Sequence, residues 1–418
     1  MVSPPQYPRF VVALVAIALA EIAFASGCAP HRSAARPGPA ARPTGVVQIA
    51  TQPDSLRAEP EPLPTRWWDA LDARGLHVPL LVATTRAAVP GARPGLALGS
   101  GDADALAFAV AAVSLPSYRA RADGATPRPV HAARPDPSRE LFVSALEPVD
   151  SARFVQRLRE RFDQSGSREV LVYVHGYNKS FELAAARLAQ VVADIGFDGT
   201  AVLFSWPSAD HIRDYVRDQQ AARNAGVHLL RLLRDVIPSA GPVTVHILVH
   251  SMGAEVLGKA LMLAEEGARP PRLGQVILAA PDIDVRTFDR EILPVLRPRT
   301  DAITLYASAH DEALRASRVL NGDWRLGLGG DSLTVRDGMT TIDASRLHGE
   351  SLSRRLSEGA RLRVGIRDAL VDALGHDLFD NPTLLADLHA LLVERQSPER
   401  RRLLQVRRSD GAVFWRFR

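Results

Sequence analysis

The segment Val249-His250-Ser251-Met252-Gly253 constrains this chain more than any other part of the sequence. It lies where the apolar run 243–248 gives way to a stretch with helical periodicity. In a G-x-S-x-G turn, small residues beside a serine let a buried strand bend sharply into a helix, which lifts the hydroxyl above the sheet. Valine replaces the first glycine here, whereas Gly253 retains the second. The segment therefore predicts a strand, a sharp turn with Ser251 as a candidate nucleophile, and a helix.

Apolar runs rich in β-branched residues alternate with amphipathic stretches along the middle of the chain. We expect strands at 170–174, 201–205, 243–248, 275–279 and 302–307, and helices at 181–195, 211–236 and 254–266. Three earlier runs, at 78–84, 105–115 and 140–146, predict an antiparallel start to the sheet. The alternation predicts an α/β fold with a mostly parallel central sheet and helices on both faces. Ligands of such sheets bind beyond the carboxyl ends of the strands.

The N-terminal segment carries the only cysteine of the 418-residue chain, Cys28. Arg9 precedes the apolar run 10–24, which is short for a membrane span and is typical of a secretory signal. Ala25-Ser26-Gly27-Cys28 follows and resembles the lipobox of bacterial lipoproteins, whose cysteine is acylated. That resemblance implies a lipid on Cys28, and Ala29 after it implies sorting to the outer membrane. An ordinary signal peptide or an uncleaved anchor is the alternative.

These features predict three parts of the chain. Residues 1–27 are expected to form a lipoprotein signal peptide, and residues 28–66, rich in Pro, Ala and Arg, a disordered tether. Residues 67–418 are expected to form a single catalytic domain, because 46% of the chain is apolar and no later stretch looks like a linker. We expect the protein to be anchored in the outer membrane and to face the periplasm or the cell surface.

Charge and composition argue against several classes of function. The net charge is +4 and there are only two lysines, while the arginines are scattered among acids, so we expect no nucleic-acid partner. The basic stretch 395–408 is interpreted as a solvated helix end. Asp210, His211 and Asp214 suit a helix start better than a metal site. Because no phosphate-binding glycine loop or dinucleotide motif occurs, we expect neither a metal nor a cofactor.

The turn after the strand 170–174 has the composition of half an oxyanion hole. His175-Gly176-Tyr177 follows this strand directly, and Gly176 would permit a close approach of the backbone. The amides of Tyr177 and Met252 could both point at a developing oxyanion, with about 3 kcal/mol of transition-state stabilisation from each donor. His175 is interpreted as a structural residue of this turn rather than as a base.

A serine nucleophile needs a histidine base and an acid that orients the histidine. Asp311 follows the strand 302–307 and is the preferred acid, with Asp282 and Asp284 as alternatives that could instead shape the site or cap a helix. His376 precedes a helix-start signal, Asp380-Asn381-Pro382, and is the preferred base. The alternatives His348 and His389 are weaker, and His250 is interpreted as a structural residue of the turn.

Several segments, taken in order, resemble a bacterial α/β-hydrolase family of unknown function. The resemblance covers about residues 78–392 and rests on Val82-Ala83-Thr84-Thr85-Arg86, Tyr173-Val174-His175-Gly176-Tyr177-Asn178, Phe204-Ser205-Trp206-Pro207-Ser208, Val249-His250-Ser251-Met252-Gly253, Tyr306-Ala307-Ser308, Asp311-Glu312-Ala313-Leu314, Thr341-Ile342-Asp343 and Gly375-His376 with Asn381-Pro382. It implies the α/β-hydrolase fold with Ser251, Asp311 and His376 at the triad positions. It does not imply a substrate.

Three functions remain open from the sequence. The first is a serine hydrolase that cleaves a small acyl ester, or a related acyl bond, through an acyl-enzyme on Ser251. The sequence leaves open a carboxylesterase, lipase, thioesterase or amidase. The second is an inactive envelope protein that uses the same fold for binding or scaffolding, which Val249 favours. The third is an acyltransferase. Protein partners cannot be inferred from the sequence.

Overall fold

A computed structural model describes residues 71–72, 75–89, 98–116, 140–209, 214–267, 272–348 and 378–418. All of them belong to one compact unit, Pro64–Arg418. Cys28, the predicted signal peptide and tether, and the candidate base His376 lie outside the described residues. Among the helices within the described ranges, none is both long enough and apolar enough to cross a bilayer.

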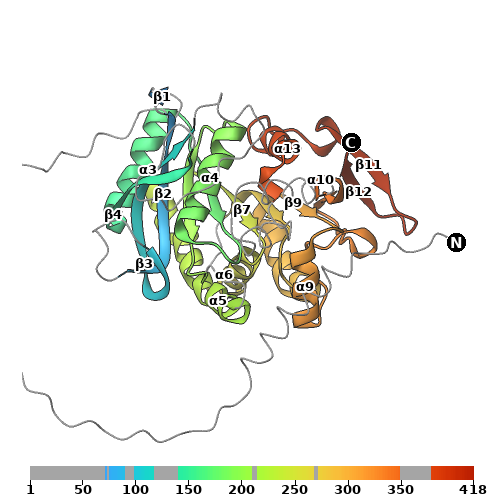
Figure 1. The fold of residues 1–418 in the computed structure, drawn as a ribbon. Helices are drawn as coiled ribbons and strands as arrows, with labels where there is room; N and C mark the ends of the chain where they lie inside the picture. The colour runs from blue at the N-terminus through green and yellow to red at the C-terminus, as the bar shows by residue number, and fades with distance from the viewer. Residues whose placement is uncertain are drawn as a thin grey trace, which may run out of the picture. The chain divides into compact units, whose positions relative to one another are not determined.

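A mixed sheet forms the centre of this unit (Figure 1). Its strands are β1 (Leu71–Asp72), β2 (Gly75–Ala88), β3 (Leu98–Leu115), β4 (Phe142–Val149), β5 (Glu169–Val174), β6 (Thr200–Ser205), β7 (Thr244–His250), β8 (Leu273–Ala279), β9 (Thr300–Ala307), β10 (Thr340–Asp343), β11 (Leu403–Arg407) and β12 (Val413–Phe417). The order is β11-β12-β10-β9-β8-β7-β5-β6-β2-β3-β4, and β1 pairs with β2. Neighbours from β2 through β6, β5, β7, β8, β9 and β10 to β12 are parallel. Strands β3 and β4 are antiparallel additions, which confirms the predicted architecture.

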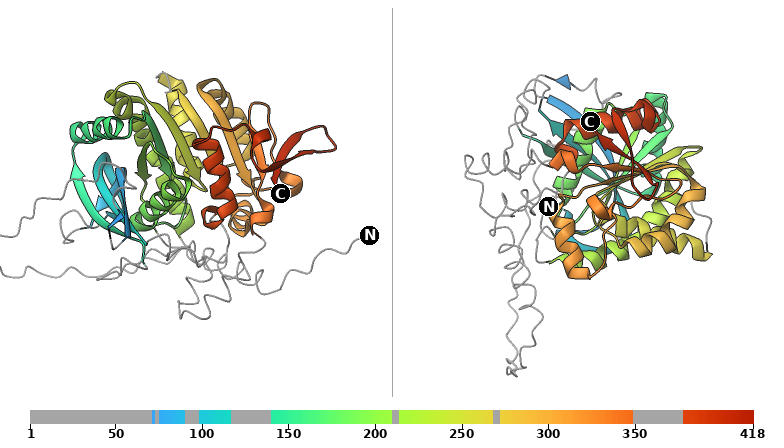
Figure 2. Two further views of the ribbon diagram at one scale, coloured as in Figure 1. Left: turned by 90° about the horizontal axis from the view of Figure 1, so that it is seen from above. Right: turned by 90° about the vertical axis from the view of Figure 1, so that its right-hand side faces the viewer.

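Helices cover both faces of the sheet (Figures 1 and 2). The longer ones are α3 (Ser151–Ser165), α4 (Phe181–Ile195), α5 (Tyr215–Arg231), α6 (Gly253–Gly267), α9 (Glu312–Asn321) and α13 (Pro382–Leu392). Helices α4 and α13 contact each other, and their apolar residues join one buried cluster with the strands. Helices α5 and α6 pack together and do not contribute to that cluster. Each face therefore has its own helical layer.

Short helical turns connect the remaining elements. They are the π-helical turns η3 (Leu232–Val236) and η5 (Phe288–Ile292), the short helices α7 (Val285–Thr287), α8 (Leu293–Leu296) and α10 (Ser345–His348), and the 3₁₀ turns η4 (Ile237–Ala240), η6 (Arg297–Arg299), η7 (Gly330–Ser332), η8 (Leu378–Asp380) and η9 (Pro398–Arg400). Several of these turns follow the carboxyl ends of β8, β9 and β10. That edge of the sheet is the one at which the candidate residues are expected.

Local signals explain where the predicted elements begin and end. Helix α4 has the predicted bounds, because Ser180 caps its first turn and Gly196, with φ 64°, ends it in a left-handed conformation. The predicted helix 211–236 is divided, since α5 ends at Arg231 and a π-helical turn continues the chain. Helix α3 was not predicted, although its buried residues Phe154, Leu158 and Phe162 recur every four positions.

The C-terminal basic stretch corrects one interpretation from the sequence. Residues 395–408 do not form a helix end, because β11 lies within them and pairs antiparallel with β12. Arg401 is 3% exposed, and its Nε lies 3.4 Å from Oδ1 of Asp387 on α13. The other oxygen of Asp387 accepts a 2.7 Å hydrogen bond from Tyr306 of β9. This buried group ties the C-terminal hairpin and α13 to the sheet, a pairing that charge patterning along the sequence cannot reveal.

Removal of Arg401 should destabilise the fold strongly. We expect Arg401→Met to lower the free energy of unfolding by about 3–5 kcal/mol, because Asp387 would be left buried without its cation. Asp387→Asn on that background should recover part of the loss, since the amide oxygen can still accept from Tyr306. Urea denaturation of the wild type, both single variants and the double variant tests the coupling. Additive losses in the double variant would contradict it.

Candidate active site

Ser251 occupies a strained turn between β7 and α6. Strand β7 ends at His250 and α6 begins at Gly253. Ser251 has φ 52°, a left-handed conformation that non-glycine residues seldom adopt and that costs about 1–3 kcal/mol. Its amide donates to Ala279 of β8, and its carbonyl accepts from the amide of Asp282. Strand β8 and the loop after it therefore fix the strained residue through both of its backbone polar groups, and a sharp strained turn of this kind is typical of a nucleophile elbow.

Two glycines permit the segments around Ser251 to meet. A Cβ on Gly253 would lie 2.7 Å from the carbonyl oxygen of Val174 and 2.8 Å from that of His175, so only glycine fits there. A Cβ on Gly176 would lie 2.7 Å from Cβ of Ser251. The turn after β5 thus touches the elbow directly. The segments that carry Tyr177 and Met252 therefore lie side by side.

Val249, which replaces the first glycine of the motif, lies within β7 and is fully buried. It pairs with Val174 of β5 on one side and with Leu278 of β8 on the other. Its side chain is accommodated in the core of the sheet, and the turn begins only at Ser251. The departure from the motif therefore leaves the geometry of the elbow intact.

The two amides predicted to form the oxyanion hole lie on either side of this contact. Met252 immediately precedes α6, where the first amides of a helix lack partners within the helix. Tyr177 follows Gly176 in the turn after β5, and its ring packs against Tyr215 of α5 with centroids 5.4 Å apart. Burial raises the pKa of the Tyr177 phenol, and Asp218 and Asp214 raise it further. The phenol of Tyr177 therefore stays neutral over the ordinary pH range.

Arg86 fixes the turn after β5 through hydrogen bonds from its guanidinium. This buried residue lies near the end of β2, and its Nη2 donates to the carbonyl of Lys179 at 2.7 Å. Its other nitrogens donate to the Ser205 hydroxyl at 2.8 Å and to the carbonyls of Ser208 and Gly99. One guanidinium therefore joins the ends of β2, β5 and β6. Charge-assisted bonds of this kind are the stronger hydrogen bonds of proteins.

Asp218 of α5 is a second buried group that fixes the same loops. It accepts hydrogen bonds from the Ser208 hydroxyl at 2.5 Å and from the amide of Ala209 at 2.9 Å. The backbone of Asn178 also donates to it. Burial raises the pKa of Asp218, whereas these hydrogen bonds lower it. Neither Arg86 nor Asp218 was singled out as a site residue from the sequence, although Arg86 closes the Val82-Ala83-Thr84-Thr85-Arg86 motif.

His175 is fully buried and engaged through both ring nitrogens. Its Nδ1 donates to the carbonyl of Gly176 at 2.9 Å, and its Nε2 accepts from the amide of Trp206 at 3.1 Å. The Trp206 indole stacks on the imidazole and donates to the His175 carbonyl at 2.7 Å. Burial lowers the pKa of His175 well below its usual value, and the charge of Arg86 lowers it further. Both ring nitrogens of His175 are thus used in contacts that hold the turn after β5.

Asp311, the preferred acid, lies at the carboxyl edge between β9 and α9. It is fully buried and caps α9, because its Oδ1 accepts from the amide of Leu314 at 2.9 Å. It also makes an interaction beyond this cap. The turn before it is fixed by Ser345, whose hydroxyl accepts from the amide of Ala309 at 2.8 Å. Asp311 is therefore held in a defined position at the edge where β7 delivers Ser251.

Both alternative acids have partners of their own. Asp282 accepts hydrogen bonds from Tyr215 at 2.9 Å and Ser317 at 2.6 Å, and its Oδ1 lies 3.4 Å from Nε of Arg325. Asp284 caps α7 by accepting from the amide and hydroxyl of Thr287. Asp282 thus braces α5 against α9, and Asp284 caps a helix.

Two of the three candidate bases, His389 and His348, lie within the described residues. His376 lies outside the described residues. His389 lies on α13, and its Nδ1 donates to the carbonyl of Ile195, the last residue of α4, at 2.7 Å. His348 ends α10.

Near the elbow, the centroid of the Phe379 ring lies 5.5 Å from that of the His250 ring and 6.1 Å from that of the Tyr173 ring. Phe379 thus packs against His250, the residue before Ser251.

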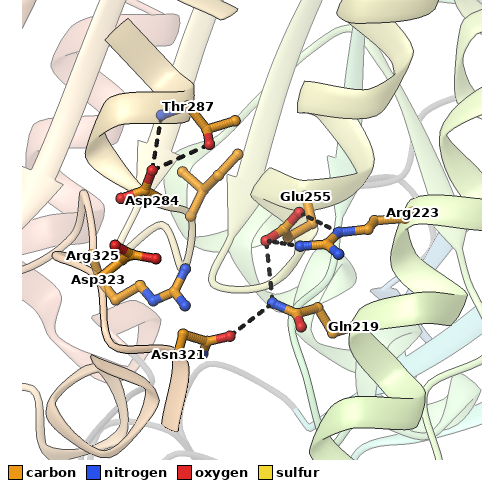
Figure 3. Close-up of a pocket in the computed structure, with 9 residues that line it drawn as sticks. Gln219, Arg223, Glu255, Asp284, Thr287, Asn321, Asp323 and Arg325 are labelled. Atoms are coloured by element: carbon orange, nitrogen blue, oxygen red, sulfur yellow. Dashed lines mark hydrogen bonds and ion pairs between the residues drawn. The ribbon is translucent and has the colours of Figure 1, made fainter. Parts of the chain in front are cut away.

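A polar cavity of about 180 Å³ lies between α5, the start of α6 and the loops after β8 and α9 (Figure 3). It is lined by Gln219, Arg223, Glu255, Ile283, Asp284, Thr287, Asn321, Asp323 and Arg325. On one side, Arg223 of α5 pairs with Glu255 of α6 at 3.0 Å. On the other side, Asp284, Asp323 and Arg325 face the cavity from the loops after β8 and α9 (Figure 3). No group of three or more potential metal ligands occurs within the described ranges.

Comparison with known proteins agrees with this geometry. Residues 150–352 match the family described as alpha/beta hydrolase of unknown function (DUF900). The predicted family is confirmed over this segment. Among curated proteins, none matches the sequence. The matched segment includes β5 to β10, the elbow and Asp311, so the chain has a hydrolase fold there.

The Gly176 contact makes a direct prediction about stability. Gly176→Ala should lower the free energy of unfolding by about 1–3 kcal/mol, because the new methyl group would overlap Ser251 and the His250 ring. Gly101→Ala on β3 is the matched control, since its methyl group would meet only Ala87 at an ordinary 3.4 Å. Urea denaturation should separate the two variants. Equal losses would show that Gly176 does not touch the elbow.

The buried neutral imidazole of His175 predicts a pH dependence. Below about pH 6.5 the unfolded chain binds a proton at this histidine and the folded chain does not, so stability falls as the pH falls. His175→Gln keeps a donor and an acceptor and removes this proton. Between pH 6.5 and 5, the wild type should lose up to about 1.4 kcal/mol per pH unit more than the variant. Parallel pH profiles of unfolding free energy would contradict the assignment.

Proposed function

We propose that this protein is a serine hydrolase that cleaves an ester or related acyl bond through an acyl-enzyme on Ser251. The observation that carries the proposal is the left-handed Ser251, φ 52°, between β7 and α6 with Gly176 packed against it. Strain of this order persists only where the surrounding structure enforces it, and such residues gather at active sites. Ser251 combines this strain with a position at the end of a central strand, which supports its role as the nucleophile.

The proposed base is His376, and the length of the chain supports it. His376 lies three residues before Phe379, whose ring packs against His250 beside the elbow. Three residues of chain span at most about 10 Å, so the short separation from Phe379 along the sequence supports His376 as the base. The proposed acid, Asp311, lies at the same edge of the sheet. The chain order Ser251, Asp311, His376 is the order of α/β hydrolases.

In the proposed reaction, His376 accepts the proton of the Ser251 hydroxyl while Oγ attacks the acyl carbonyl carbon. The amides of Tyr177 and Met252 donate to the oxyanion of the tetrahedral intermediate. As the acyl–oxygen bond breaks, His376 returns the proton to the departing alkoxide, and the acyl group remains on Ser251. Water, activated by His376, then attacks the acyl-enzyme and releases a carboxylic acid. Arg86 and Asp218 serve as positioning residues, because they hold the loop that carries Tyr177.

A fluorophosphonate probe tests the mechanism, because it reacts preferentially with an activated serine. The full chain should be labelled, and Ser251→Ala should abolish labelling. We expect His376→Ala and Asp311→Asn to slow labelling by about 10²-fold or more, the usual contribution of general acid–base catalysis. Asp282→Asn is the matched control, since it removes the same charge from the alternative acid and should slow labelling much less.

The outcomes of this experiment separate the alternatives. Labelling of a residue other than Ser251 would overturn the nucleophile assignment. A larger effect of Asp282→Asn than of Asp311→Asn, with both variants folded, would exchange the two acids. If the folded wild type stayed unlabelled, the hydrolase mechanism would be abandoned in favour of the binding or scaffolding function. Product analysis with an added alcohol would distinguish hydrolysis from acyl transfer.

A further inference from the structure

The polar cavity between α5, α6 and the loops after β8 and α9 is lined by side chains that have donor or acceptor atoms without a hydrogen-bond partner among the described residues (Figure 3). Its walls come from α5, α6, α7 and the loops after β8 and α9, and none of its lining residues belongs to the proposed triad. The backbone pairing of Asp284 with Arg325 holds the two loops together. The cavity is therefore built on fixed elements and is separate from the reacting groups.

Arg325 is the first such group. It is 3% exposed, yet its guanidinium donates no hydrogen bond to any residue in the described part of the chain. Its Nε lies 3.4 Å from Asp282, whose carboxylate already accepts from Tyr215 and Ser317. A buried cation normally satisfies its donors, because an unmade hydrogen bond to a charged group is costly. Arg325 therefore presents unused donors at the wall of the cavity.

Two carboxylates face the same space. Oδ1 of Asp284 is buried and accepts no hydrogen bond from the described residues, while Oδ2 is occupied by Thr287. Asp323 has neither an ion pair nor a hydrogen bond within the described ranges, and it lies next to Arg325 in Figure 3. By contrast, Glu255 is neutralised by Arg223 across the cavity. The unused groups are thus two acids and one guanidinium, gathered on one wall.

The charges on that wall indicate the ligand. Three carboxylates and two guanidiniums line the cavity, and Asp282 adds a further acid behind Arg325, so the negative charge is in excess. An ammonium group would satisfy Asp284 and Asp323, and an oxygen on the same molecule would accept from Arg325. We propose that the cavity binds a small amine that also carries an oxygen acceptor, as amino alcohols and amino acids do. Its volume, about 180 Å³, equals roughly six water molecules and suits a compact ligand.

Titration calorimetry with three probes of similar size tests the chemistry. Ethanolamine carries both groups, ethylene glycol lacks the amine, and ethylamine lacks the oxygen. The full chain should bind ethanolamine about tenfold or more tighter than either of the others, since each charge-assisted bond contributes at least that much. Ethanolamine that bound no tighter than ethylene glycol would overturn the proposal, and so would preferential binding of acetate.

Variants locate the site. Asp323→Asn removes a carboxylate that supports no other contact of the described structure, so the fold should be retained and ethanolamine binding weakened about tenfold or more. Asp331→Asn is the matched control, because Asp331 is exposed and does not line the cavity. Equal effects of the two substitutions would assign the binding to another site. Ser251→Ala should bind ethanolamine normally, so failure of the hydrolase proposal and failure of this one are distinguishable.

Discussion

The rest of the structure depends on the approach of α6 to the end of β5. The first residue of α6, Gly253, lies so close to the carbonyls of Val174 and His175 that no Cβ could be placed between them. Because helix and strand meet there, Ser251 must turn with positive φ, and Gly176 is brought against its side chain. The elbow and the loop beside it are therefore one packed unit. The proposed nucleophile and the proposed oxyanion-hole amides would gain their fixed geometry from this contact.

Buried polar residues, rather than the apolar core, set the positions of the loops at the carboxyl edge. Arg86 joins the ends of three strands, Asp218 joins α5 to the loops after β5 and β6, and Asp282 joins α5 to α9. Apolar packing is non-directional and tolerates small shifts, whereas a satisfied buried hydrogen-bond network has one geometry. If one residue of such a network is lost, the donor or acceptor that it bonded stays buried without a partner, which is costly. Each network therefore resists rearrangement. The edge is thus rigid where chemistry is proposed.

The polar groups at the same edge are of two kinds, which differ in how many of their donors and acceptors have hydrogen-bond partners. His175 uses both ring nitrogens, and Asp218 accepts from three directions, so these residues are structural supports. Arg325, Asp284 and Asp323 retain unused capacity around a cavity. Hydrogen-bond satisfaction therefore separates groups that hold the fold from groups that are available to a ligand. Residue type alone would not distinguish Asp218 from Asp284.

The sequence by itself determined the parallel core of the fold and the position of the elbow. Strands β5 to β9 and helix α4 follow from local hydrophobic periodicity and caps, and Ser251 follows from a short motif at a strand end. The C-terminal hairpin was misjudged, because β11 depends on pairing with β12 and Arg401 on the distant Asp387. The tertiary structure alone decided that Val249 fits within β7, that Asp282 is braced by Tyr215 and Ser317, and that Arg325 faces a cavity. Local patterns encode elements through short-range preferences, whereas the partner of a buried charge is fixed only when distant segments pack together.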